Sequence, residues 1–199
     1  ATDGKRLALI ERPFPDGQPE INEVKKCIIP YKAVGELGKL IRLQEEEYIH
    51  VLNGKNQIGI DFANVQFISQ LIEGEFPDYR KYLLKESDNK CTIDRSRFLA
   101  ALKRANLLTS TDFQGVKLAL EKNRMVISKI TPQLGEYKEE IDAEYSGKEM
   151  SIGFNPDYLL DVLKALEPET VTFELYGEDK PLVFRSQGYI YLALPMRMS

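Results

Sequence analysis

The sequence predicts an α+β protein whose antiparallel sheets are covered on one face by helices. A unit of one short amphipathic helix followed by two or three strands recurs three times, with helices expected to begin near Pro30, Asp94 and Asn155. The strands alternate apolar and polar residues, which is typical of sheets with one buried face. A unit this small cannot close a hydrophobic core alone, so the units must pack against each other. This repetition favours a scaffold over a single catalytic centre.

The first unit opens with a strand expected over residues 5–11, followed by a loop over residues 12–19 that carries three prolines. Pro30 suits the first turn of a helix, because its missing N–H has no helical partner at that position. Three apolar residues follow at helical spacing and predict one inward-facing stripe, made of Val34, Leu37 and Ile41.

A hairpin is expected after this helix. Asn53-Gly54 predicts a tight turn between strands over residues 48–52 and 57–61, and a further strand follows at residues 65–68. Phe76-Pro77 ends the unit, because proline cannot donate to a strand ladder.

The second helix is expected to begin at Asp94, a favoured N-cap residue. Its inward-facing residues are predicted to be Phe98, Leu102 and Ala105. Alternating apolar residues then predict strands at residues 116–120, 125–129 and 137–145, the last with one face in solvent.

A strand over residues 150–154 leads to the third helix, which begins near Asn155. The apolar stripe of this helix is predicted to consist of Leu159, Val162, Leu163 and Leu166. Strands over residues 171–175, 182–184 and 189–194 complete the sheet.

The polar, turn-rich run over residues 86–89 predicts a domain boundary. If a domain consists of two helix-plus-strand units, residues 83–199 form a complete domain. Residues 1–82 then form only the second part of another domain, and we expect its first part to lie upstream of Ala1.

Composition excludes several classes of protein. The apolar share of 43% is enough for a packed core, and no apolar run is long enough to cross a bilayer. Cys27 and Cys91 lie far apart without metal-ligand spacing, which favours two reduced thiols in a cytoplasmic protein. The net charge of −4 means that any surface for nucleic acid must be local.

No motif points to catalysis. His50 is the one histidine and has no partner at motif spacing, and residues 146–149 lack the glycines of a phosphate-binding loop. Adjacent carboxylates, as in Glu139-Glu140, point to opposite faces of a strand, so they are expected in solvent rather than as an acid–base pair. We therefore expect no catalytic residue, metal or cofactor. A hydrolase that uses clustered carboxylates stays as an alternative.

Positive charge gathers on two of the three helices. The helix over residues 94–106 carries four basic residues against one acidic residue, and the helix over residues 30–43 carries three against one. The pattern fits a surface that contacts phosphates without reading bases, which would bind in a salt-dependent manner. An ordinary solvated helix face is the alternative, and the slightly acidic third helix favours it.

The C-terminal residues 190–198 are apolar almost to their end, although chain ends are usually polar. Met196 and Met198 could line an adaptable hydrophobic groove, since thioether side chains conform to varied partners. The alternative is that the tail only completes the last strand.

Several segments in family order resemble the bacterial sliding clamp family, the beta subunit of DNA polymerase III. They are residues 1–8 (ATDGKRLA), 76–80 (FPDYR), 113–116 (FQGV), 145–147 (YSG), 152–155 (IGFN), 158–166 (YLLDVLKAL) and 194–197 (LPMR). The resemblance implies the DNA-clamp fold, with antiparallel sheets outside and paired helices on the inner face. It further implies one partial and one complete clamp domain out of three, in a protomer that forms a homodimeric ring around duplex DNA.

The implied function is a processivity factor that does no chemistry and tethers DNA polymerases, the clamp loader and repair proteins through short linear motifs. The resemblance implies a peptide-binding pocket between the middle and third domains, in which Arg6 or Arg197 could steer a peptide carboxylate. Carried over position by position, the pocket residues are Thr2, Gly4, Lys5, Arg6, Leu7, Pro77, Lys81, Tyr82, Pro181, Leu192, Ala193, Leu194, Pro195, Met196, Arg197 and Met198. Lys5, where many relatives have histidine, and Ser199, after Met198, depart from the family pattern.

The same resemblance implies two further surfaces. The basic residues expected to face DNA are Lys32, Lys39, Arg42, Arg95, Arg97, Lys103 and Arg104. Leu107 and Leu108 match the third-domain dimer contact of the family. The runner-up hypothesis is an adaptor of the same fold that does not bind DNA and uses its apolar C-terminus to hold partner peptides.

Overall fold

The computed structural model describes residues 1–13, 26–43 and 48–197. Internal contacts divide the chain into two compact units. The larger unit consists of Ala1–Phe14 with Leu83–Ser199, and the smaller unit consists of Pro15–Tyr82. The first strand belongs to the larger unit because its ladder partner is the last strand of the chain.

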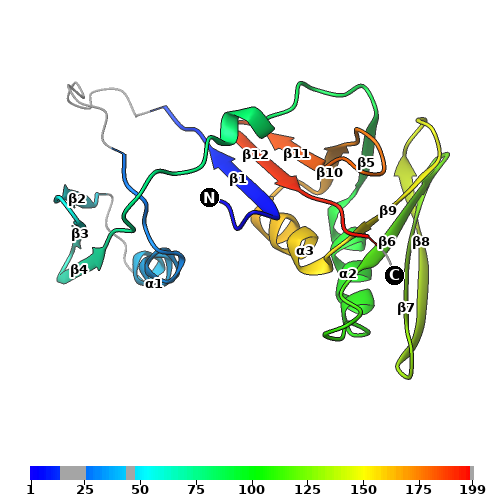
Figure 1. Cartoon of the computed structure of the whole chain (residues 1–199), viewed down its shortest axis with the longest axis horizontal. Helices are drawn as coiled ribbons and strands as arrows, with labels where there is room; N and C mark the ends of the chain where they lie inside the picture. The colour runs from blue at the N-terminus through cyan, green and yellow to red at the C-terminus, as the bar shows by residue number, and fades with distance from the viewer. Residues whose placement is uncertain (14–25, 44–47, 198–199) are drawn as a thin grey trace. The chain divides into compact units, whose positions relative to one another are not determined.

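The larger unit is built on a nine-stranded sheet in which all neighbours are antiparallel, in the order β1-β12-β11-β10-β5-β8-β7-β6-β9. The strands are β1 (Arg6–Ile10), β5 (Lys90–Asp94), β6 (Val116–Glu121), β7 (Arg124–Thr131), β8 (Gly135–Glu144), β9 (Met150–Phe154), β10 (Thr170–Glu174), β11 (Leu182–Ser186) and β12 (Tyr189–Ala193). Helices α2 (Arg95–Asn106) and α3 (Pro156–Ala165) pack against each other and against the sheet (Figure 1). The predicted α+β class is confirmed.

The chain after β12 connects the two edge strands of this sheet, β1 and β9. Leu194 N donates to Lys5 O at 2.9 Å, which extends the pairing with the β1 side. Met196 N then donates to Gly153 O on β9 at 2.8 Å. The tail therefore runs from the β1 edge of the sheet to its β9 edge, and the sheet curls enough for one short segment to reach both.

The helices of the larger unit begin where local chemistry predicts. The Asp94 carboxylate accepts a hydrogen bond from Arg97 N at 2.8 Å, and Asn155 Oδ1 accepts one from Asp157 N at 2.9 Å. These side chains satisfy N–H groups that a helix start leaves unpaired. The predicted inward faces are confirmed, since all seven residues are buried: Phe98, Leu102, Ala105, Leu159, Val162, Leu163 and Leu166.

In its described residues, the smaller unit contains one α-helix, a three-stranded antiparallel sheet and a short 3₁₀ helix. The elements are α1 (Tyr31–Arg42), β2 (His50–Asn53), β3 (Gln57–Phe62), β4 (Val65–Gln70) and η1 (Tyr79–Tyr82). The predicted hairpin is confirmed, with β2 paired to β3 across the turn after Asn53. Most of the predicted loop over residues 12–19, and the carboxylates at residues 45–47, lie outside the described residues.

The predicted stripe on α1 is only partly correct. The small core of this unit consists of Ile58, Ile60 and Phe62 on β3, and Leu37 and Leu40 of α1 pack against it. Val34 keeps 51% of its surface exposed and Ile41 keeps 38%. Helical spacing identified the apolar side of α1, but the sheet contacts only the Leu37–Leu40 edge of that side.

Candidate binding surface at the paired chain ends

The first and last strands of the chain lie side by side in the larger unit (Figure 1). Arg6 pairs with Ala193 and Leu7 pairs with Leu192 in the β1–β12 ladder. Leu7 and Leu192 are buried, whereas Leu194, just beyond the ladder, is 39% exposed. Two groups of predicted pocket residues, far apart in sequence, are thus brought together as an apolar base with a partly exposed tail.

Residues 1–4 fold back against β1. Thr2 forms a bridge with Leu7, and its hydroxyl donates to Arg6 O at 2.7 Å. Gly4 has a φ of +85°, a backbone conformation that favours glycine, so its place among the predicted residues has a conformational reason. After this turn the backbone of Lys5 lies beside the tail, because Leu194 N donates to Lys5 O.

Arg6 is held by its own neighbours. Its guanidinium binds Asp161 at 2.6 Å and Asp3 at 2.9 Å, and it lies 4.6 Å from the centre of the Tyr158 ring. Partial burial opposes its charge, but the hydrogen bonds to these carboxylates outweigh burial, so the pKa of Arg6 is raised. Two carboxylates already neutralise Arg6, which makes it a poor group for steering a peptide carboxylate. Arg197, exposed in the tail, keeps that expected role.

Tyr158 and Asp161 were not among the predicted site residues. They lie three positions apart on α3 and therefore share one face of that helix. Tyr191 on β12 ties this part of α3 to the sheet, because its hydroxyl donates to Tyr158 O at 2.8 Å. Burial raises the pKa of Tyr191 to about 12, so this hydroxyl stays protonated at neutral pH. No local pattern could reveal these residues, since Arg6 lies far away in sequence.

The other predicted pocket residues fall in three places. Pro181 precedes β11, whose first residue Leu182 pairs with Ala193. Pro77, Lys81 and Tyr82 belong to the smaller unit. Met198 lies outside the described residues.

The structure sorts the predicted DNA-facing residues into paired and unpaired side chains. Arg95 donates to Pro168 O at 2.8 Å and to Leu163 O at 3.2 Å, so it fastens α2 to the end of α3. Lys39 binds Glu36 at 2.8 Å. Of the seven predicted DNA-facing residues, the three that are exposed and make no ion pair or side-chain hydrogen bond within the described part of the chain are Lys32, Arg42 and Lys103.

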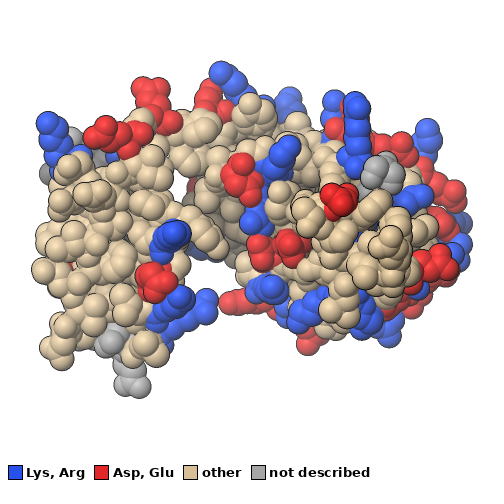
Figure 2. All heavy atoms as spheres, turned by 60° about the horizontal axis from the view of Figure 1, so that its bottom comes forward, with Lys and Arg blue, Asp and Glu red and all other residues tan. Residues whose placement is uncertain are grey.

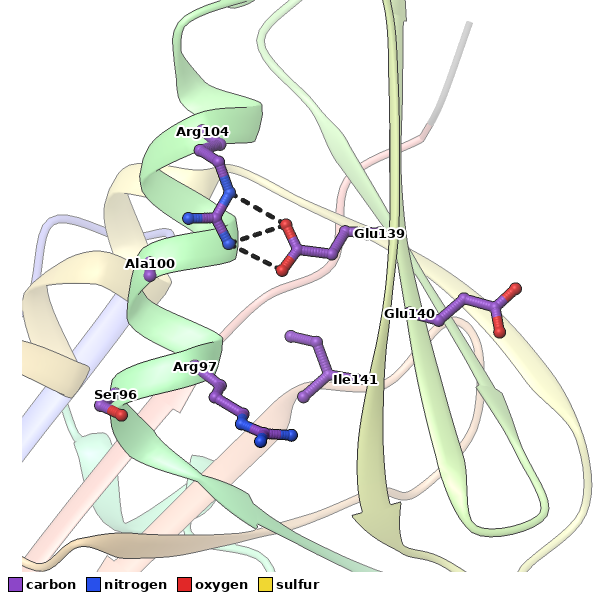
Figure 3. A pocket seen from close by; sticks show the side chains of 7 residues that line it. All are labelled: Ser96, Arg97, Ala100, Arg104, Glu139, Glu140 and Ile141. Atoms are coloured by element: carbon purple, nitrogen blue, oxygen red, sulfur yellow. Dashed lines mark hydrogen bonds and ion pairs between the residues drawn. The ribbon is translucent and has the colours of Figure 1, made fainter.

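Two further basic residues line a shallow groove of about 330 Å³ between α2 and β8 (Figure 3). Arg104 binds the Glu139 carboxylate through two nitrogens of its guanidinium: Nε donates to Oε2 at 2.9 Å and Nη2 donates to Oε1 at 2.7 Å. Arg97 approaches Asp142 at 3.5 Å. Glu140 points away from the groove that Glu139 faces, as expected for neighbours on a strand. The groove therefore holds a satisfied ion pair and no pair of carboxylates suited to acid–base chemistry.

Charge on the visible surface is mixed. Figure 2 shows Lys and Arg side chains interleaved with Asp and Glu side chains over the larger unit. Leu107, directly after α2, is 81% exposed, and Leu108 is half-buried. His50 is exposed, and Cys27 and Cys91 are free thiols.

Neither a metal cluster nor a membrane-spanning helix is found in the part of the chain that the structure describes. Residues 1–13, 26–43 and 48–197 contain no group of three or more His, Cys, Asp or Glu side chains arranged to hold a metal ion. None of the helices described is both long enough and apolar enough to span a membrane.

Comparison with known proteins gives two successive family matches. Residues 1–78 match the central domain of the DNA polymerase III beta subunit, and residues 80–197 match its C-terminal domain. A beta sliding clamp of Staphylococcus aureus is 35% identical over 202 residues, and one of Salmonella typhimurium is 35% identical over 201 residues. These matches cover 99% and 100% of this chain but 52% and 54% of the relatives. The chain thus spans about half the length of the curated relatives it matches.

Solved structures give the same result. A sliding clamp of Bartonella birtlesii bound to griselimycin superposes with a TM-score of 0.91 at 30% identity, over 100% of this chain and 54% of that one. A DNA polymerase sliding clamp of Pseudomonas aeruginosa superposes with a TM-score of 0.87 at 31% identity, over 100% of this chain and 54% of that one.

Proposed function

Because this chain belongs to the DNA polymerase III beta subunit family of bacterial sliding clamps, we propose that it serves as part of a replicative processivity factor. In this proposal the full-length protein is a cytoplasmic homodimer that encircles duplex DNA and catalyses no reaction. Residues 83–199 form its third domain. Residues 1–82 contribute to its middle domain, and their first strand, β1, is the part that pairs with β12 and so clusters with the larger unit. DNA polymerases, the clamp loader and repair proteins bind it through short linear motifs.

The pairing of β1 with β12 is the observation that supports peptide binding best. It joins Lys5, Arg6 and Leu7 to the tail that carries Leu194 and Met196, all of which the family resemblance assigns to one pocket. Partly exposed apolar side chains over a buried base are the kind of surface that anchors apolar peptide residues. Tyr158, stacked on Arg6, adds an aromatic surface beside them.

A labelled peptide with two apolar anchor residues, titrated by fluorescence anisotropy, tests this proposal. Met196→Ala and Leu194→Ala should each weaken binding by about tenfold, which is ~1.4 kcal/mol. Ile10→Ala is the matched control, because Ile10 is a 64% exposed apolar residue on the same first strand but at its other end. Leu7 is too buried for this purpose, since its truncation would also weaken the fold. Absence of binding, or equal affinity for all variants, would refute the site.

For DNA we propose weak, salt-sensitive contacts from the unpaired cations Lys32, Arg42 and Lys103. Arg95 and Arg104 are poorer candidates because backbone carbonyls and Glu139 already occupy their donors. Lys103→Glu should lower the affinity for duplex DNA at low salt, whereas Lys138→Glu on β8 should not. Tight sequence-specific binding would contradict a clamp, which is held by topology.

An adaptor that binds partner peptides but not DNA is the second candidate. The interleaved charges in Figure 2 and the internally paired basic residues favour it. A full-length protein with no DNA affinity at any salt concentration, and with no ring in solution, would support this candidate over the clamp.

A further inference from the structure

Lys129 on β7 is a buried lysine without an acidic partner among the described residues. Only 2% of its surface is exposed, and its Nζ donates to Phe113 O at 2.5 Å and to Gly115 O at 2.8 Å. Met125 and Ile127, on the same face of β7, are fully buried and apolar. An apolar residue at position 129 would continue that face without the cost of burying a charge. What a lysine adds at this position, and an apolar residue could not, is the pair of hydrogen bonds from its ammonium to the two carbonyls.

Thr131, two positions further along β7, makes a contact of the same kind. Its surface is 2% exposed and its hydroxyl donates to Leu108 O at 2.5 Å. Both side chains come from one strand and bind carbonyls of one segment, the loop over residues 107–115 that joins α2 to β6. The loop is thus fastened near its start at Leu108 and near its end at Phe113 and Gly115.

The fastened loop carries one large apolar residue into solvent. Leu107 is 81% exposed, and its N–H donates to Arg104 O at 3.2 Å, so it continues the last turn of α2. Leu108 N donates to Ala105 O at 3.1 Å, and Ser110 N donates to Phe113 O at 3.2 Å. Inside the loop, Thr109 N donates to Asn106 O at 3.0 Å and Phe113 N donates to Ser110 Oγ at 3.3 Å. These bonds are local to the loop, whereas the contacts from Lys129 and Thr131 tie it to β7.

We propose that Lys129 and Thr131 are positioning residues that hold the 107–115 loop so that Leu107 is presented to the second protomer of the full-length protein. This inference rests on the proposed function, in which Leu107 and Leu108 form the third-domain dimer contact. A loop that is ordered before association loses less conformational entropy when it binds, which favours the dimer. The buried charge then serves the interface rather than the core.

Hydrogen exchange and sedimentation of the full-length gene product test this role. Lys129→Met keeps the length of the side chain but removes its donors, and Thr131→Val keeps its shape but removes the hydroxyl. Each should speed amide exchange in residues 107–115 by about tenfold and raise the dimer dissociation constant about tenfold, a change of ~1.4 kcal/mol. Lys138→Met is the matched control, since it removes an exposed lysine from β8 of the same hairpin. It should change neither quantity.

A purely structural role makes a different prediction. If the role is purely structural, both variants should lower the urea midpoint of the whole unit. The dimer dissociation constant, compared at equal folded fraction, should then equal that of the wild type. The inference also fails if loop exchange stays at the wild-type rate in both variants. Leu107→Ser tests the dimer contact separately from the fastening of the loop. An unchanged dimer dissociation constant in this variant would refute the proposed contact itself. If Lys129→Met does not fold, Thr131→Val alone decides the outcome.

Discussion

Replacing Glu174 with glutamine would test how strongly the larger unit depends on one buried carboxylate. Glu174 ends β10 and is 4% exposed. Its Oε2 accepts hydrogen bonds from the Tyr176 hydroxyl at 2.6 Å, from Arg185 Nε at 3.1 Å and from Ser87 N at 3.4 Å. Arg185 in turn donates to Leu84 O at 2.6 Å. The network therefore ties the segment that leads into β5 to the β10–β11 hairpin.

The expected cost follows from what glutamine keeps and what it loses. Its carbonyl oxygen can occupy the Oε2 position and keep the three donors, but the charge that Arg185 faces is removed. A hydrogen bond to a charged partner contributes about 1 kcal/mol more than a neutral one, and an uncompensated, mostly buried Arg185 adds a similar amount. We expect Glu174→Gln to lower the free energy of unfolding by about 2 kcal/mol, and Glu174→Ala by about 3 kcal/mol or more.

The same network predicts a pH dependence with a definite sign. Burial opposes the charge on Glu174, but hydrogen bonds from Tyr176 and Arg185 outweigh burial, so the pKa of Glu174 lies below its usual 4.5. A carboxylate with a lowered folded-state pKa stabilises the fold at neutral pH, and that stability is lost as the pH falls from the usual value through the lowered one. The difference between wild type and Glu174→Gln should therefore shrink in acid.

Urea unfolding followed by circular dichroism at neutral pH and at about pH 3 measures this difference, with hydrogen exchange of β10 and β11 to locate it. Glu167→Gln is the matched control, because Glu167 is exposed after α3. The reasoning is wrong if Glu174→Gln is as stable as the wild type at neutral pH. It is also wrong if the gap stays constant in acid.

Three further predictions concern a helix cap, a core side chain and the two thiols. Asp94→Ala should cost about 1 kcal/mol of unfolding free energy through the lost α2 cap, whereas Asp112→Ala in an exposed turn should cost none, and equal losses in urea melts would contradict this. Phe98→Ala should cost about 3 kcal/mol or more because Phe98 is fully buried, and a loss below about 1 kcal/mol would contradict that packing. A disulfide reagent at neutral pH should modify exposed Cys27 but not Cys91, because Cys91 is inaccessible and burial raises its pKa to about 12; equal rates in the folded protein would disprove this.

Local signals in the sequence predicted local structure well. The caps at Asp94 and Asn155 act within one turn, so the starts of α2 and α3 could be predicted from neighbouring residues alone. Alternation over residues 125–129 predicted the strand that the structure contains as β7. Such features depend on residues that are close along the chain.

The binding surface depended on distant residues and was harder to predict. The family resemblance grouped Arg6 with the tail, but nothing in the sequence indicated that Asp161 would neutralise it. The exposed Val34 shows the same limit for packing, because spacing defines an apolar side of α1 without showing how much of it a sheet covers. Predicting either feature requires the placement of a partner element, which periodicity does not contain.

The pairing of β1 with β12 also constrains how the chain can fold during synthesis. β1 leaves the ribosome long before β12, the strand it pairs with, has been made. Until then, one edge of β1 has open hydrogen-bonding groups that another chain could occupy. Closure over so long a stretch of chain is also slow, because the entropy of the intervening segment is lost before the ladder forms. Newly made protein should therefore pass through a stage, vulnerable to aggregation, in which α2, α3 and their strands have folded while the first strand still waits for its neighbour.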